Sequence, residues 1–308
     1  MAVEFRNIPE QDVHVPIVVA GAGACGLTAA LAAADAGAAA LVLERDAEPA
    51  GSTAMSYGAI CAAGTTLQRA AGIDDEPAWL EEDILEITRG QTDRALARLI
   101  ATESGPTVEW LAERHGLALT LETTWTGMGH RRPRLHAPPD RSGQTLINQL
   151  QAAAAAADVD VVTAAKVTTV YADDSHRVTG VAVTRPDGAV EVIACDALII
   201  ATCGFGANRD MVAAHLPAVR EARYYGHEGN EGDGIAWGTA LGGAVADMGA
   251  YQALGSLADP QAIVIPHTLL IGGGIQVNTR GSRFENELEN ISGQALTILE
   301  QPGGVCWI

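Results

Sequence analysis

A strand, a glycine-rich turn and a helix follow one another near the start of the chain, and this order restricts the possible folds more than any other feature. Residues 15–20 form a nearly continuous apolar run, which is typical of a parallel strand covered on both faces. Glycines in G-x-G-x-x-G spacing occupy residues 21–26, and strong helix formers fill residues 27–36. A second apolar strand at residues 40–43 ends at Glu44. The pattern predicts an α/β fold that begins with a β-α-β unit and a parallel sheet.

Each glycine of this turn has its own role in a dinucleotide-binding unit. Gly21 allows the tight turn, Gly23 lets the backbone approach a pyrophosphate, and Gly26 lets helix and strand pack closely. The first helical turn, which includes Ala24 and Cys25, supplies N–H groups and a partial positive charge for phosphates. The alternative interpretation is a purely structural glycine turn in an α/β sheet.

Glu44 stands at the end of the second strand, where dinucleotide-binding units place an acidic residue. A carboxylate there accepts hydrogen bonds from both hydroxyls of an adenosine ribose and disfavours a 2′-phosphate. The sequence therefore predicts NAD or FAD rather than NADP, and this motif alone does not separate the two.

The composition excludes several classes of protein. A length of 308 residues is enough for about two domains, and 48% hydrophobic residues with 19% charged residues do not fit a disordered chain. The formal net charge is −19, and Lys166 is the only lysine, so a nucleic acid or an anionic membrane would be repelled. The expected partner is a small-molecule substrate, with neither nucleic acid nor membrane.

The cysteines point to a reducing compartment. They are Cys25, Cys61, Cys195, Cys203 and Cys306. Their odd number, wide spacing and lack of a C-x-x-C pair indicate neither a disulfide framework nor a zinc cluster, and no metal site is expected. The acidic first dozen residues argue against a secretory signal, so the cytoplasm is the simplest location. Residues 15–34 are uncharged, but Pro16 and three glycines favour a strand, a turn and a helix over a membrane span.

Later motifs make a family resemblance specific. Residues 44–46 are followed by Gly-Ser-Thr-Ala-Met-Ser-Tyr-Gly-Ala-Ile at residues 51–60. The chain then carries four more motifs: Ala-Thr-Cys-Gly-Phe at 201–205, Gly-Asp-Gly-Ile at 232–235, Gly-Ile-Gln-Val-Asn at 274–278 and Arg-Phe-Glu-Asn-Glu at 283–287. In this order they resemble the FAD-binding half of the flavoprotein superfamily that includes fumarate reductase, succinate dehydrogenase and 3-ketosteroid dehydrogenase.

The resemblance implies a two-part α/β architecture. A Rossmann-like FAD-binding domain, with a parallel sheet plus a β-meander, is expected over residues 1–253, followed by the start of an α+β cap or substrate domain over 254–308. Periodicity within residues 77–115 and residues 144–157 predicts helices. Apolar runs between turn signals predict the later strands at residues 159–163, 167–171, 178–184, 190–193 and 197–201.

The resemblance also implies which residues hold FAD. The loop at 51–59 would wrap the diphosphate and place backbone N–H groups near flavin N5, Val167 would pair with the adenine edge, and Asp233 would contact the sugar chain. Ser52 stands where covalently flavinylated relatives carry a histidine, so noncovalent FAD is expected. The implied contacts are Gly21, Gly23, Ala24, Cys25, Gly26, Glu44, Arg45, Gly51, Ser52, Thr53, Ser56, Gly58, Ala59, Val167, Ala201, Thr202 and Asp233.

Several of these positions have structural alternatives. The second loop could be a glycine-rich surface loop, Val167 could belong to a plain strand, and Asp233 could be the N-cap of a helix. Cys203 replaces a usual glycine of the family, and a cysteine there is more typical of a small packed hydrophobe than of a redox centre.

His267 and Tyr57 are the candidate catalytic residues. His267 stands roughly where fumarate-reducing members hold a substrate carboxylate, and Tyr57 lies in a loop similar to that of ketosteroid dehydrogenases, where tyrosines act as acid, base or carbonyl clamp. The alternatives are a hydrogen-bonded loop histidine and a tyrosine packed over a flavin.

Two departures from the family pattern argue against fumarate. Residues 268–273 leave no room for the glutamate and arginine of the proton path, and Ile291 replaces the acid-donating arginine. The resemblance therefore implies an FAD-dependent oxidoreductase that transfers hydride between flavin N5 and an activated C=C or CH–CH bond. An enone or ketosteroid-like substrate is favoured over fumarate.

Other functions remain open at this point. A non-catalytic flavin-binding subunit or fragment is one, and an NAD-dependent dehydrogenase is another, although the latter does not explain the loop at 51–60. Residues 304–308 resemble the start of a buried strand, and family members continue for about a further domain. A second chain or a missing C-terminal portion is therefore expected to complete the fold.

Overall fold

The chain divides into two compact units. The computed structural model describes residues 2–9, 13–127, 129–266, 268–288 and 291–308. The first unit comprises Met1–Gly204 with Gly232–Val245, and the second comprises Phe205–Glu231 with Ala246–Ile308. The functional boundary expected between residues 253 and 254 stays a prediction.

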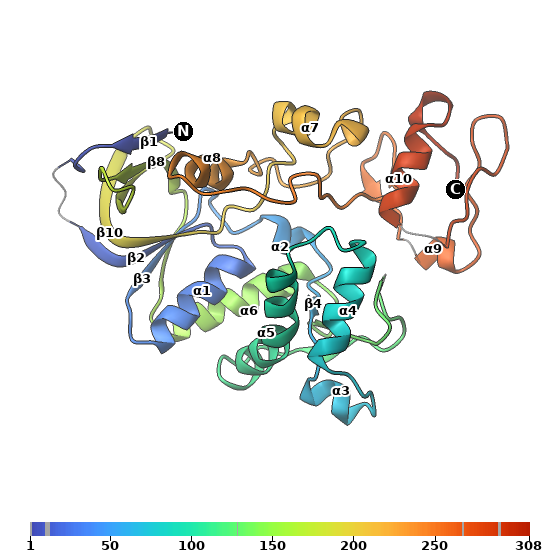
Figure 1. Ribbon diagram of the computed structural model, residues 1–308, viewed down its shortest axis with the longest axis horizontal. Helices are drawn as coiled ribbons and strands as arrows, with labels where there is room; N and C mark the ends of the chain where they lie inside the picture. The colour runs from blue at the N-terminus through green and yellow to red at the C-terminus, as the bar shows by residue number, and fades with distance from the viewer. Residues whose placement is uncertain (1, 10–12, 128, 267, 289–290) are drawn as a thin grey trace. The chain divides into compact units, whose positions relative to one another are not determined.

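The first unit is built around a seven-stranded sheet in the order β1-β8-β9-β10-β2-β3-β7 (Figure 1). β2 pairs in parallel with β10 and β3, and β3 pairs in parallel with β7. β8, β9 and β10 form an antiparallel meander, so the predicted parallel sheet plus β-meander is confirmed. The strands are β1 (Ala2–Phe5), β2 (His14–Ala20), β3 (Ala40–Leu43), β7 (Asp160–Val162), β8 (Lys166–Ala172), β9 (Val178–Thr184) and β10 (Val190–Ile200).

β10 is longer than the sequence predicts. Two strands are expected at 190–193 and 197–201, whereas β10 is continuous. Its first half pairs with β9 and its second half pairs with β2. The polar residue that interrupts the apolar pattern, Asp196, is exposed and lies 3.2 Å from His14 Nε2. The strand therefore continues through this position without burying a charge.

Helices cover both faces of the sheet. The apolar sides of α1 (Ala24–Asp35) and α6 (Gly143–Ala156), including the alanine run of α6, pack with Val19. Val18 packs into a second cluster with Trp237 of α8 (Asp233–Ala240). Because consecutive strand residues point to opposite faces, β2 is covered on both sides, as its apolar run predicts.

Residues 60–137 form an insertion between the glycine-rich loop at 51–60 and α6, and it is called the helical insertion because α3, α4 and α5 lie in it. The periodicity of residues 77–115 predicts helices, and α4 and α5 are found there, packed together. A small sheet in the same insertion has the order β4-β6-β5. The elements of this helical insertion are β4 (Ile60–Cys61), α3 (Thr66–Ala70), α4 (Pro77–Ile87), α5 (Arg94–Glu113), β5 (Thr120–Leu121) and β6 (Leu135–Ala137).

The second unit is smaller and contains mainly short elements. Val212, Leu216 and Val219 form its apolar cluster. The strand predicted at residues 304–308 is reduced to a bridge, in which Trp307 N–H donates to the carbonyl of Val277 at 2.8 Å. The elements are α7 (Arg209–His215), η1 (Pro217–Val219), β11 (Leu257–Ala258), β12 (Ile263–Val264), α9 (Thr268–Ile271), α10 (Ile291–Leu299) and η2 (Pro302–Gly304).

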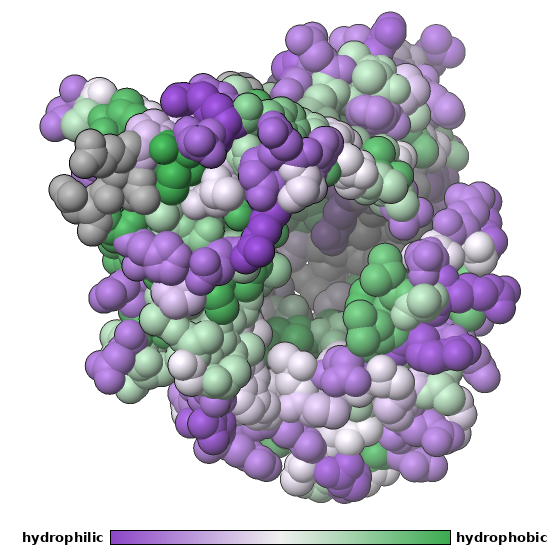
Figure 2. Space-filling model, turned by 60° about the vertical axis from the view of Figure 1, so that its left-hand side comes forward, coloured by the Kyte–Doolittle hydropathy of each residue, from purple (hydrophilic) through white to green (hydrophobic). Residues whose placement is uncertain are grey.

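Hydrophilic and hydrophobic residues alternate over the surface on the side drawn in Figure 2. Among the described residues, no helix is both long enough and apolar enough to cross a membrane.

Candidate functional site

The turn between β2 and α1 can be built only with glycine at two positions. Gly21 has a φ of +108°, and a Cβ on it would lie 2.4 Å from the carbonyl oxygen of Ala201. A Cβ on Gly26 would lie 1.9 Å from the carbonyl oxygen of Gly21. At Gly21 and Gly26, backbone segments therefore lie too close together for any side chain to fit. This is the close approach of helix and strand expected of a dinucleotide-binding turn.

The N-terminus of α1 is suited to an anion. Gly23 is its N-cap, and within the described residues no side chain caps the helix. Helix-start N–H groups carry partial positive charge and lack intrahelical partners. One of them, that of Ala24, donates to Thr53 Oγ1 at 3.0 Å, so the second glycine-rich loop is attached directly to the first. Cys25 is exposed in the same helical turn.

Glu44 is buried at the carboxyl end of β3, and its carboxylate is fixed by two backbone groups. Oε2 accepts the N–H of Ala22 at 2.9 Å, and Oε1 accepts the N–H of Asp46 at 3.1 Å. Because each carboxylate oxygen has two lone pairs, both oxygens can still accept a ribose hydroxyl. Together with the glycine turn and the start of α1, this geometry fits the adenosine and diphosphate of FAD.

The second glycine-rich loop begins with the short helix α2 (Ser52–Met55). Ser56 stabilises the remainder of the loop, because its Oγ donates to the carbonyl of Thr53 at 2.7 Å and accepts the N–H of Gly58 at 3.0 Å. The carbonyl of Ser56 accepts the N–H of Gly143 at 2.9 Å, and a Cβ on Gly143 would lie 2.0 Å from the carbonyl oxygen of Thr53. The start of α6 therefore supports the loop, and sequence reasoning missed this contact. The Ser-Gly pair at residues 142–143 is the signal that could have indicated it.

Four further predicted contacts lie in the same unit. Gly51 is the N-cap of α2, and Ala59 is exposed at the end of the loop. Arg45 lines an open hollow of about 470 Å³. Val167 is buried in the core, in register with Val183 of β9. The lining of the hollow is Arg45, Ala164, Lys166, Thr168, Thr184, Arg185 and Pro186.

The end of β10 meets the start of α8. The N–H of Ala201 donates to the carbonyl of Ala20 at 2.9 Å, and Thr202 Oγ1 accepts the N–H of Gly234 at 3.1 Å. Asp233 is buried as the first residue of α8, and Gly232, with a φ of +85°, is the N-cap. The N-cap position of α8 is occupied by Gly232, so the N-cap interpretation of Asp233 is wrong.

Cys203 has a φ of +62°, which explains why a glycine is usual in the family at this position. The cysteine is exposed in the structure, and its role as a small packed hydrophobe beside the cofactor stays a prediction. Its Sγ lies 3.2 Å from Ser52 Oγ, between the end of β10 and the second glycine-rich loop.

Tyr57 is held by a carboxylate that sequence reasoning missed. Its hydroxyl donates to Glu122 Oε2 at 3.2 Å, and Arg141 Nε donates to the same oxygen at 3.1 Å. The hydroxyl of Thr124 is the main reason why the pKa of Glu122 is lowered to about 2, and the bond from Arg141 adds to it. Burial first, and the charge of Glu122 second, raise the pKa of Tyr57. The signal that could have pointed to Glu122 is its place directly after the short strand β5. His267 lies outside the described residues.

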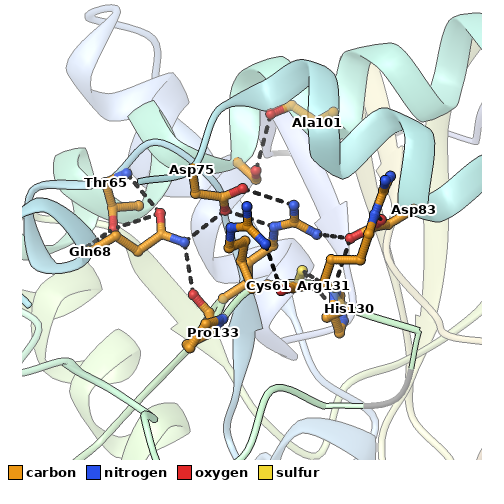
Figure 3. A network of polar contacts seen from close by, with 12 residues as sticks. Cys61, Thr65, Gln68, Asp75, Asp83, Ala101, His130, Arg131 and Pro133 are labelled. Carbon is orange, nitrogen blue, oxygen red and sulfur yellow. Dashed lines mark hydrogen bonds and ion pairs between the residues drawn. The ribbon is translucent and has the colours of Figure 1, made fainter. Parts of the chain in front are cut away.

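A separate polar network lies inside the helical insertion (Figure 3). The Arg134 and Asp75 side chains are fully buried and form two bonds of 2.7 and 2.8 Å. Arg134 also bonds Asp83, whose pKa is lowered because contacts with Arg131 and Arg134 outweigh its burial. Burial raises the pKa of the neighbouring Cys61 to about 11. Such fully paired charges indicate a structural network rather than a reactive centre.

Comparisons with known proteins agree with this geometry. The FAD binding domain family matches residues 16–305. The protein named "Probable fumarate reductase Ifc3" of Shewanella frigidimarina is 30% identical over 294 residues, which cover 95% of this chain and 50% of that protein. The chain thus spans about half the length of this curated relative.

Two solved structures have the same fold. A flavocytochrome c3 fumarate reductase in its open conformation has a TM-score of 0.87 and 30% identity, covering 97% of this chain and 53% of that one. The 3-ketosteroid-Δ4-(5α)-dehydrogenase of Rhodococcus jostii RHA1 has a TM-score of 0.76 and 26% identity, covering 96% of this chain and 66% of that one. The resemblance expected from the motifs is confirmed. The chain belongs to the FAD binding domain family, and its cofactor is FAD.

Proposed function

We propose that this chain is the flavin-binding part of an oxidoreductase that acts on CH–CH groups. When bound, FAD supplies hydride transfer between its N5 atom and a carbon of an activated C=C or CH–CH bond. The observation that carries the proposal is the 30% identity, over 95% of this chain, to a protein named as a probable fumarate reductase. The hydrogen bond from Ala24 N–H to Thr53 Oγ1 supports the cofactor part, because it joins the diphosphate turn to the loop expected along the flavin.

The residues of the first unit would hold the cofactor without a covalent bond. Glu44 would accept the ribose hydroxyls, and the N-terminus of α1 would face the diphosphate. The loop from Gly51 to Ala59 would lie against the ring, where Ser52 offers no histidine nitrogen for attachment. Arg45, Val167, Ala201, Thr202 and Asp233 would complete the cofactor contacts.

An enone or another electron-poor alkene is proposed as substrate in preference to fumarate. Ile291 at the position of the family's acid-donating arginine supports this choice. His267 is proposed to contact the substrate or move a proton, and Tyr57 is proposed to lie next to the reacting carbons.

A second candidate is a flavin-binding subunit that needs another chain for activity. The observation that favours it is that the chain covers 50% of its fumarate reductase relative. A reducing cytoplasm is proposed as the location, and its support is that all five cysteines are free.

The absorption spectrum of the purified chain tests the proposal. A yellow protein that releases FAD into the supernatant after acid denaturation is the expected result, and yellow colour retained on the polypeptide would contradict noncovalent binding. Dye-coupled assays with an enone and with fumarate then test the substrate class. Fumarate reduction faster than enone reduction would contradict the substrate choice. Enone turnover by the chain alone would contradict the subunit hypothesis.

A further inference from the structure

Two large aromatic side chains are exposed beside the loop proposed to lie along the flavin. Tyr57 is 42% exposed and belongs to that loop, and Trp125 is 39% exposed in the helical insertion. Met55, at the end of α2, is exposed as well. Exposed aromatic rings that are held in place are typical of ligand sites, because they supply contact area at a low cost in conformational entropy.

One buried carboxylate, that of Glu122, binds Tyr57 and the residue that directly precedes Trp125. Glu122 Oε2 accepts the Tyr57 hydroxyl, while Glu122 Oε1 accepts the N–H and the hydroxyl of Thr124 at 2.8 and 2.5 Å. Trp125 follows Thr124 directly in the chain. The hydroxyls of Tyr57 and Thr124 therefore meet at the same carboxylate, and the backbone next to Trp125 is fixed by it.

The same carboxylate determines what Tyr57 can offer a ligand. The phenol hydrogen points to Glu122, so the outward side of Tyr57 presents an aromatic ring and an oxygen that can only accept a hydrogen bond. Arg141 also bonds Thr120 Oγ1 at 2.5 Å and the carbonyl of Pro138 at 3.2 Å. Its Nε and Nη1 groups are thus engaged by Glu122 and its neighbours.

We propose that Tyr57 and Trp125 form an aromatic wall of the substrate site, which selects alkenes that carry a flat apolar group over small dicarboxylates. Glu122 is the positioning residue of this wall. The inference rests on the proposed function, because the wall faces substrate only if the loop at 51–60 lies along the flavin. A substrate of this class would be an aryl-conjugated enone or a fused-ring ketone.

Ligand titrations of the FAD-loaded chain test the aromatic wall. Benzylideneacetone and fumarate are added in separate experiments, and the change in flavin absorption reports the binding of each. Tyr57→Ala and Trp125→Ala should each weaken benzylideneacetone binding by about three- to tenfold, the range of one aromatic contact, and change the fumarate response less than twofold. Tyr57→Phe keeps the ring and should restore most of the affinity. Glu122→Gln, which removes the anchoring charge, should give an intermediate loss.

Tyr225→Ala is the matched control, since Tyr225 is 44% exposed in the second unit, and it should bind benzylideneacetone like the unmodified chain. Unchanged affinity in both alanine variants would overturn the wall, and so would an unmodified FAD-loaded chain that does not bind benzylideneacetone. Failure of the unmodified chain to take up FAD would contradict the proposed function instead. Measured FAD content shows that each variant is folded.

Discussion

The cofactor-binding turn and the helical insertion lie in one compact unit, yet they are stabilised by opposite means. Around β2, α1 and β3, apolar side chains pack at close range, and Gly21 and Gly26 allow backbone atoms to meet. In the helical insertion, Arg134 lies fully buried between the carboxylates of Asp75 and Asp83. The stability of the first region depends on glycines that leave room for close backbone contacts. The stability of the second depends on every buried charge having its partner.

This difference predicts different responses to substitution. An apolar core loses stability in proportion to the atoms removed, because neighbouring side chains relax only in part. A buried charge network fails as a unit, since removal of one partner leaves the others desolvated and unpaired. The contrast can be tested by changing one residue in each region.

Arg134→Ala should have the largest effect. It leaves Asp75 and Asp83 buried without their cation, and a loss of about 3–5 kcal/mol in the free energy of unfolding is expected. Urea unfolding followed by circular dichroism measures it. Arg98→Ala is the control, because Arg98 forms an exposed pair with Glu81 and should cost at most about 1 kcal/mol. Equal losses of unfolding free energy in the two variants would show that the buried network contributes no more to stability than an exposed ion pair.

Gly26→Ala should have the next largest effect, on cofactor binding as well as on stability. The added Cβ would lie 1.9 Å from the carbonyl oxygen of Gly21, so the turn must shift, at a cost of about 3 kcal/mol. FAD content and urea unfolding measure the two consequences. Gly238→Ala, in the interior of α8 where no described atom lies within 4 Å of the added Cβ, should be neutral or slightly stabilising. Full FAD content in Gly26→Ala would contradict the proposed close approach.

The cofactor-binding region could be predicted from sequence because its signals are local. The apolar runs, the glycine spacing and Glu44 lie within one short segment, and each has a direct physical reason. The network could not be predicted in this way, because Arg134 lies 51 residues from Asp83 and 59 residues from Asp75 in the chain, and all three look like ordinary solvated charges. Glu122 was missed for the same reason, since its partner Tyr57 comes from another loop.

Glu44→Gln probes the polar side of the cofactor-binding region. Glutamine keeps one acceptor oxygen and loses the charge, so FAD should bind about tenfold more weakly, the loss of roughly one charge-assisted hydrogen bond. Titration of apoprotein with FAD, followed by quenching of flavin fluorescence, measures it. Glu48→Gln is the control, because Glu48 is exposed on the same connection. An unchanged affinity for FAD in Glu44→Gln would contradict the proposed contact between Glu44 and the ribose.

Glu122→Gln should lower stability only within a range of pH. The pKa of Glu122 is about 2 in the folded chain against an ordinary value of 4.5, so its carboxylate stabilises the fold above pH 4.5. This stabilisation is lost as the pH falls through about 2. The stability difference between the unmodified chain and the variant should therefore be greatest above pH 4.5 and shrink towards pH 2 in urea unfolding. A difference that grows as the pH falls would contradict the assignment.

The hydrogen bond between Gly143 N–H and the Ser56 carbonyl has a topological consequence. Gly143 contacts the second glycine-rich loop at Ser56, and this loop ends at Ala59. The helical insertion, residues 60–137, is therefore an excursion that begins and ends beside the loop. The entropy of closing such an excursion changes by only about 0.6 kcal/mol for each doubling of its length. Evolution can thus lengthen, shorten or exchange this segment, and with it Glu122 and Trp125, while the backbone that meets the cofactor stays where it is.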